Sequence, residues 1–316
     1  MTQSLAAAPV LIADRQERRG RKTALPSSSA TVGEPDGPMI EYGKSSEGFL
    51  VARVDEISFA MIPTRNGGHY LATGWRISRS MDAWTRADFY GHSGDLADEA
   101  AFRARVEENA EHQRERKALG RIQTFPRVHT PWGVSQGATV YAEGVICHST
   151  ASHGGFHLSA ERNRNVPALL RAKDGHYEED SAWAIVAITF PRLFTSFERR
   201  CAERTIKDFW PDAWEAISGT ILAPGESHEK DRRAFEKQHA GDWVVISAIN
   251  SRAHSGRVEV VATLGGKRGA DIEQRRFLVP SSEYAVGRFG FVIDPDRHER
   301  HDGASSFAIP PRRAMS

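Results

Sequence analysis

The chain has 316 residues, 40% of them hydrophobic, which is enough for one large domain or about two or three small ones with real cores. Its 42 Lys and Arg residues balance 41 Asp and Glu residues, so the charge gives no support for nucleic acid binding over the whole surface. We find no secretory signal and no apolar run long enough for a membrane helix, and two cysteines suit a reducing cytoplasm.

Residues 1–44 are expected to form a flexible, disordered basic arm. Basic residues cluster between Arg15 and Lys22, and a run rich in Ser, Gly and Pro follows from Pro26 to Pro38. One interpretation is a solvated tail. The other is an arm that contacts nucleic acid phosphates or another protein.

Residues 45–120 are expected to form a small antiparallel β-meander followed by a helix. Short apolar runs and turn signals predict strands at Phe49–Val54, Ile57–Ile62 and Tyr70–Ile77. From Asp95 to Gly120 the pattern is helical, with acidic residues early and basic residues late. The apolar stripe of this helix is narrow, so the helix should lie on a surface or meet a partner.

Residues 121–219 are expected to form a central α+β unit. Strands are predicted at Ala138–His148 with an interruption at Glu143-Gly144, at Phe156–Ser159 and at Ala182–Phe190. Helices are predicted from Asn165 to Arg171, from Leu193 to Phe209, and around Trp214 up to Gly219.

Residues 220–300 are expected to form a helix and an antiparallel sheet that packs with the central unit, and residues 301–316 a tail. The helix is predicted at Glu229–His239, and strands are predicted at Trp243–Ile249, Val258–Leu264, Arg276–Val279 and Phe289–Ile293. From His298 onward the pattern indicates a frayed end. The predicted fold class is therefore α+β, with mainly antiparallel β-sheets, flanking helices and a flexible N-terminal arm.

The stretch Cys147–Ser159 concentrates more polar chemistry than a surface needs. It holds His148, His153 and His157 around two adjacent glycines, which favour a hairpin over a helix. In a hairpin, His148 and His157 could face each other across the strands, with His153 at the turn. Three imidazoles so placed could hold zinc or another divalent metal. The spacing matches no specific zinc signature, so a non-metal site and a structural hairpin remain alternatives.

Three carboxylates, Glu178, Glu179 and Asp180, precede the predicted strand at Ala182. Alternation would point Glu178 and Asp180 to one side and Glu179 to the other. One interpretation is an exposed acidic loop. The other is a carboxylate beside the histidine hairpin, acting as a general base or as the partner of a histidine, and these three residues are then the catalytic candidates.

The candidate binding residues surround the same segments. They are Trp132, His148, Ser152, His153, Gly154, Gly155, His157 and Tyr177. The sequence has no phosphate loop and no Gly-x-Ser-x-Gly elbow that would point to a different site.

Four motifs in order resemble an uncharacterised bacterial family, domain of unknown function 7007. They are Thr130–Gln136, Ser149–Ser159, Tyr177–Asp180 and Trp183–Ala187. The resemblance covers about residues 128–295, including Arg276–Pro280 and Gly290–Asp294. The family occurs in alphaproteobacteria, often on plasmids and integrative elements, and brings no established activity. The resemblance implies a cytoplasmic accessory protein carried with mobile DNA.

Two functions of different classes follow. The first is a non-enzymatic, mobile-element accessory protein that binds a macromolecule through the histidine hairpin and the acidic loop. The second is a metal-dependent hydrolase or nuclease, in which His148, His153 and His157 are ligands and one of the three carboxylates is a ligand or base. The sequence alone does not decide between a binding module and an enzyme.

Overall fold

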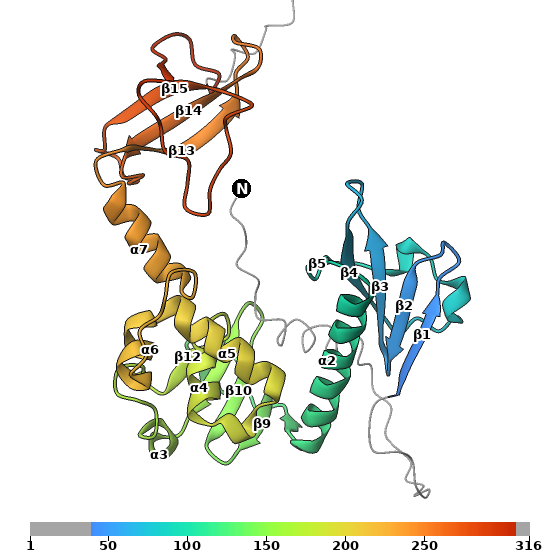
Figure 1. Cartoon of the computed structure of the whole chain (residues 1–316). Coiled ribbons are helices and arrows are strands. Elements are labelled where there is room, and N and C mark those ends of the chain that lie inside the picture. The colour runs from blue at the N-terminus through green and yellow to red at the C-terminus, as the bar shows by residue number, and fades with distance from the viewer. Residues whose placement is uncertain (1–38, 308–316) are drawn as a thin grey trace, which may run out of the picture. The chain divides into compact units, whose positions relative to one another are not determined.

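The computed structural model describes residues 39–307, and residues 1–38 of the predicted arm lie outside them. The chain divides into two compact units, with the boundary between Ile206 and Lys207. Within the described residues, the first unit holds two five-stranded sheets and the two-stranded sheet β7-β8, and the second holds a four-stranded sheet (Figure 1). All paired strands are antiparallel, so the predicted α+β class with flanking helices is confirmed.

The first sheet is the predicted meander, with strands paired in chain order. Its strands are β1 Ile40–Lys44, β2 Leu50–Val54, β3 Ile57–Pro63, β4 His69–Trp75 and β5 Asp95–Leu96. Two 3-10 turns, Met81–Ala83 and Arg86–Asp88, separate β4 from β5. Strand β1 corrects the expectation that residues up to 44 form a disordered arm, because Ile40 and Tyr42 pack against the core of this sheet.

Helix α2, Glu99–Ala118, packs its narrow apolar stripe against the first sheet. The Asp98 side chain caps the helix by accepting the Ala101 N–H at 2.7 Å. Phe102, Val106 and Ala110 are buried among sheet residues, so the sheet is what this stripe meets.

The central sheet has the order β12-β11-β10-β9-β6. Its strands are β6 Ile122–Thr124, β9 Gly137–Ala142, β10 Val145–Ser149, β11 Gly154–Leu158 and β12 His176–Glu178. A small hairpin of β7 His129–Thr130 and β8 Gly133–Val134 lies between β6 and β9 in the chain. The predicted interruption at Glu143-Gly144 is the turn between β9 and β10, where Gly144 adopts a φ of 74°.

Two secondary-structure predictions in this unit are wrong. The apolar run Ala182–Phe190 forms helix α4, Trp183–Thr189, and not a strand. A run that is buried all round has no periodicity to separate helix from strand, and its alanines favour a helix. The helix expected from Asn165 to Arg171 is replaced by turns, and the short helix α3 lies earlier, at Ala160–Asn163.

A buried ion pair ties helix α5, Ser196–Phe209, to the residue before β6. Arg121 donates to both carboxylate oxygens of Glu198, at 2.8 and 2.5 Å, and to the Leu193 carbonyl at 2.8 Å. Glu198 is fully buried and also accepts the Thr195 N–H at 2.8 Å. The guanidinium carbon lies 4.0 Å from the ring centroid of Tyr141. Both charges are thus paired and bonded, as buried charges must be.

The same first turn of α5 also contacts α2. The Nδ1 atom of His112 lies 2.8 Å from the Thr195 hydroxyl, and Glu115 accepts the Ser196 N–H at 2.5 Å and its hydroxyl at 2.6 Å. Burial lowers the pKa of His112 to about 4, although Glu198 opposes the shift, so this ring is neutral at pH 7.

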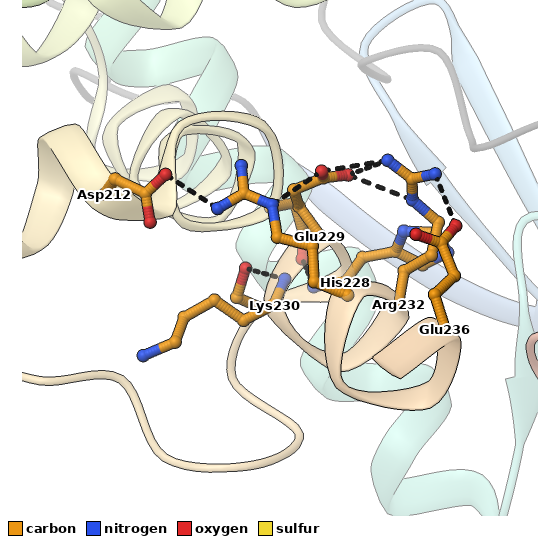
Figure 2. Close-up of polar contacts among 9 residues, drawn as sticks. Asp212, His228, Glu229, Lys230, Arg232 and Glu236 are labelled. Atoms are coloured by element: carbon orange, nitrogen blue, oxygen red, sulfur yellow. Dashed lines mark hydrogen bonds and ion pairs between the residues drawn. The ribbon is translucent and has the colours of Figure 1, made fainter. Parts of the chain in front are cut away.

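In the second unit, arginine and carboxylate side chains link α6, Pro211–Ser218, to α7, His228–Gln238, as Figure 2 shows. Arg233 joins Asp212 at 2.7 Å to Glu229 at 3.0 Å. Arg232 continues the chain from Glu229 at 2.7 Å to Glu236 at 2.9 Å. Arg232 and Arg233 remain about half exposed, so each of these pairs adds little stability by itself.

The C-terminal sheet confirms three of the four predicted strands. It consists of β13 Trp243–Asn250, β14 Arg257–Leu264, β15 Gln274–Pro280 and β16 Glu299–Arg300. The segment predicted as a strand at Phe289–Ile293 forms no continuous strand: Val292 makes an isolated bridge to Val244 of β13, and Gly290 makes another to Gly287. Gly290, at a φ of 138°, turns back onto Gly287 and interrupts the extended run.

The segment expected to be frayed after His298 is bonded to this sheet as far as Ser306. The buried carboxylate of Glu259 pairs with Arg276 at 2.9 Å and accepts the Ser305 hydroxyl at 2.9 Å and the Ser306 N–H at 2.7 Å. Burial opposes ionisation, but these hydrogen bonds hold the pKa of Glu259 at about 2. Residues 308–316 of the predicted tail lie outside the described residues.

Glu198→Gln is expected to lower the free energy of unfolding by about 3 to 5 kcal/mol, because it leaves the Arg121 charge buried without its partner. Urea unfolding of the full chain measures this loss. Glu203→Gln, at an exposed position on the same helix, is the matched control and should cost less than about 1 kcal/mol. Equal losses in the two variants would contradict the assigned role of the pair.

Candidate functional site

Helices cover one face of the central sheet. Cys147, Phe156 and Tyr177 are cross-strand neighbours on this face, and all three are buried. Phe156 packs against Phe194, just before α5, with ring centroids 5.8 Å apart, and α4 lies against β11 and β12 (Figure 1). We call this the covered face.

The opposite face, which we call the open face, carries two rows of side chains across all five strands. The pairing register gives a first row of Ile122, Val140, Ile146, His157 and His176. It gives a second row of Thr124, Ala138, His148, Gly155 and Glu178. Because alternate residues of a strand point to the same side, the histidines of three strands share this face with an apolar strip.

Trp132 lies over the open face at Gly155, where no other residue would leave room for it. A Cβ atom on Gly155 would meet the Trp132 ring at 2.5 Å and the Tyr177 carbonyl oxygen at 2.3 Å. Trp132 comes from the turn between β7 and β8, and its ring meets the His176 ring edge-on, with centroids 5.8 Å apart. Gly155 therefore leaves the space into which the Trp132 ring packs.

The imidazoles around Trp132 are packed and partly bonded. Nδ1 of the buried His148 lies 3.1 Å from the Ser135 hydroxyl. His157 stacks on His176 with centroids 4.7 Å apart, and Asp174 Oδ2 lies 3.3 Å from His176 Nδ1 without the alignment of a hydrogen bond. Burial, followed by repulsion from neighbouring imidazoles, lowers the pKa of His148 and of His157. At pH 7 these two rings are neutral and can both donate and accept a hydrogen bond.

The predicted histidine hairpin exists, but its register differs from the expectation. His148 pairs with Gly155, and His157 pairs with Ile146, so the two imidazoles do not face each other directly. The two glycines begin strand β11 and do not form the turn. The turn is instead closed by Thr150, whose hydroxyl donates to the His153 carbonyl at 2.7 Å.

Several candidate residues lie away from the open face. Ser152 and His153 are exposed in the hairpin turn. Tyr177 belongs to the covered face, where its hydroxyl donates to Asn163 at 2.6 Å and accepts the Ala172 N–H at 3.1 Å. The structure thus gathers Trp132, His148, Gly155 and His157 from the predicted set, and it adds His176.

Of the three candidate carboxylates, Glu179 reaches the hairpin: a Cβ atom on Gly154 would meet its Oε2 at 2.8 Å, at a strand position that alternates with those of Gly155 and His157. Strand β12 ends at Glu178, so the predicted alternation stops there, and the Glu178 carboxylate accepts the backbone N–H groups of Asp180 and Ser181. Glu179 donates its own N–H to the Gly154 carbonyl at 3.0 Å, and Asp180 is exposed. Within residues 39–307, no three or more His, Cys, Asp or Glu residues are grouped so that they could hold a metal ion.

His176 is the site residue that sequence reasoning missed. Its signal was the alternation of His176, Tyr177 and Glu178, in which polar residues flank a buried aromatic ring as in a half-buried strand. This alternation spans only three residues, and the acidic residues Glu179 and Asp180 that follow do not continue it.

Comparison with known proteins supports the family resemblance for the central region. Residues 126–240 match the model of a family described as a domain of unknown function (DUF7007). This range includes the whole open-face cluster of Trp132, His148, His157 and His176, and it ends before Arg276–Pro280. No curated protein and no solved structure gives a significant match. None of the helices in residues 39–307 has the length and apolar character needed to cross a membrane.

Gly155→Ala is expected to displace Trp132 and to lower the free energy of unfolding by about 1 to 3 kcal/mol through overpacking. Urea unfolding measures the loss, and the indole N–H signal of Trp132 in NMR spectra reports the displacement. The matched control is Gly137→Ala in the same sheet, where an added Cβ meets its nearest neighbours at 3.9 Å. An unshifted Trp132 signal in Gly155→Ala would show that the ring does not lie on this glycine.

Proposed function

We propose that this chain is a macromolecule-binding protein without catalytic activity, and that the open face is its recognition surface. The observation that carries the proposal is the difference between the two faces of one sheet. Helices bury the covered face, whereas on the open face Ile122 is 62% exposed and Val140, Ile146, His157 and His176 are partly exposed. Val134, next to the Ser135 that bonds His148, is 46% exposed. Exposed apolar groups gathered in one place are typical of an interaction surface.

The chemistry of the open face favours a protein partner. None of the residues in its two rows is a lysine or an arginine, and Glu178 is the charged member of the rows. At the margin, Asp174 adjoins His176, and Arg127 lines a hollow together with Val134 and Ser135. Binding of nucleic acid depends on cations that neutralise phosphates. A central tryptophan among apolar and neutral polar groups is instead typical of the energetic centre of a protein interface.

The geometry favours binding over metal-dependent hydrolysis. His148 is held by Ser135, and His157 stacks on a third histidine that is not aligned with a carboxylate for hydrogen bonding. Glu178 uses its carboxylate on backbone N–H groups. A hydrolase would need a base and its ligands to converge on one position, and these side chains point to separate partners.

We further propose that the protein works in the bacterial cytoplasm as an accessory of mobile DNA. This part rests on the family resemblance alone. A contact with nucleic acid would come from the basic cluster between Arg15 and Lys22, which is outside the described residues.

Site-specific photo-crosslinking in cells tests the recognition surface. A benzophenone amino acid at Ile122 or Val134 is expected to give discrete protein adducts that resist nuclease, because both positions lie at the exposed margin of the open face. The matched control is the same group at Arg204, an exposed position on α5. Adding Trp132→Ala should weaken the open-face adducts. Equal adducts from Arg204, or adducts that nuclease removes, would overturn the proposal of a protein partner.

A further inference from the structure

A pocket lies beside α2 in the first unit. Its volume is about 200 Å³, and β3, β4, α2, the segment before β5 and the start of α5 all contribute to it. Most of its lining is apolar or aromatic, with Phe59, Leu71, Trp75, Tyr90 and Phe197 among the residues around it. The polar residues around it are Thr73, Ser93, Arg105, Glu108, Asn109 and His112. Aromatic walls together with polar groups that can orient a ligand are typical of small-molecule sites.

The pocket exists because α2 covers only part of the sheet. The stripe of Phe102, Val106 and Ala110 is buried against the sheet core, and the neighbouring flank of the helix carries Arg105 and His112. Residues three, four and seven positions apart share one side of a helix, so this flank presents polar groups over the apolar ends of β3 and β4.

Charged groups at the pocket are already paired. Arg105 lies 4.0 Å from Glu108 and donates to the Ser93 carbonyl at 3.3 Å. Glu108 also binds Arg200 at 2.6 Å. Because Arg105 and Glu108 are paired, they present no net charge to a ligand. The pocket therefore favours binding of an uncharged molecule.

His112 supplies one neutral donor. The Thr195 hydroxyl accepts the Glu198 N–H at 3.1 Å and lies 2.8 Å from His112 Nδ1. A hydroxyl can accept two hydrogen bonds and donate one, so this geometry fits either tautomer of His112. In the tautomer whose Nδ1 accepts the Thr195 hydrogen, the single N–H of the neutral ring is at Nε2, on the part of the ring edge that Thr195 does not occupy.

We propose that this pocket binds a small, uncharged aromatic molecule that carries a carbonyl oxygen. The aromatic ring lies among Trp75, Tyr90 and Phe197, and the carbonyl oxygen accepts the Nε2–H of His112. An apolar cavity of about 150 Å³ is known to hold benzene, so a pocket of about 200 Å³ suits one ring with a small substituent. This site is separate from the open face and does not depend on the proposed function.

Titration of the full chain with benzamide tests the proposal, with the indole N–H signal of Trp75 as the local NMR reporter. Benzamide is expected to shift this signal to saturation with a Kd on the order of 1 mM. His112→Phe keeps a ring at this position but removes the donor, and it should bind benzamide about fivefold to tenfold more weakly because the hydrogen bond is missing. Equal benzamide binding by His112→Phe and by the unaltered chain, or no saturable shift with benzamide, would overturn the proposal.

Variants of Thr73, which lines the pocket on β4, locate the binding. Thr73→Phe fills the pocket and should abolish the benzamide shift, whereas the isosteric Thr73→Val should keep it. Thermal unfolding of both variants checks that they fold. If Thr73→Phe does not fold, Tyr90→Ala removes an exposed wall and should weaken benzamide binding about fivefold. Unchanged binding in the folded variant would place benzamide elsewhere and overturn the proposal.

Discussion

The buried pair of Arg121 and Glu198 is the interaction on which the arrangement of the first unit depends. Removing two charges from water is unfavourable. The pair offsets this cost because the two terminal nitrogens of Arg121 bond to Glu198 and to the Leu193 carbonyl, and Glu198 also accepts the Thr195 N–H, although the buried Nε of Arg121 has no partner. The carboxylate is thereby fixed in the first turn of α5. That turn then supplies the hydroxyl that meets His112 and the N–H that meets Glu115. The Arg121–Glu198 pair thus sets the position of the start of α5, which contacts both α2 and the covered face of the central sheet.

This constraint gives the central sheet its asymmetry. With the start of α5 fixed, Phe194 lies on Tyr141 and Phe156, and the covered face becomes part of a core. No comparable helix packs on the other side among the described residues, where Gly155 seats Trp132 between imidazoles. The lowered pKa values keep His148 and His157 neutral, so a partner can displace water from these two rings without burying a charge on them. The proposed recognition surface thus results from an arrangement in which helices cover one face of the central sheet and leave the other face without a helix.

The helices and strands could be predicted from the sequence better than the contacts between them. The meander, helix α2 and the hairpin at Cys147 follow from local period and turn residues, which a chain carries in short windows. The register of the hairpin could not be predicted from these windows. Two adjacent glycines are compatible with a turn, and equally with a strand whose backbone lies directly under an aromatic ring, as Gly155 lies under Trp132. Arg121 and Glu198 lie 77 residues apart, so no local pattern joins them. The helix at Trp183 was missed because a run that is buried on every side has lost the period that distinguishes helix from strand.

Thiol labelling tests the central claim that the Arg121–Glu198 pair holds helices on one face and leaves the other open. In a Cys201→Ser background, the native Cys147 reports the covered face, and Ile122→Cys reports the open face. The account predicts rapid modification of Ile122→Cys in the folded protein, protection of Cys147, and loss of that protection when Glu198→Gln is added. Equal labelling of Cys147 and Ile122→Cys in the otherwise unaltered fold would contradict it.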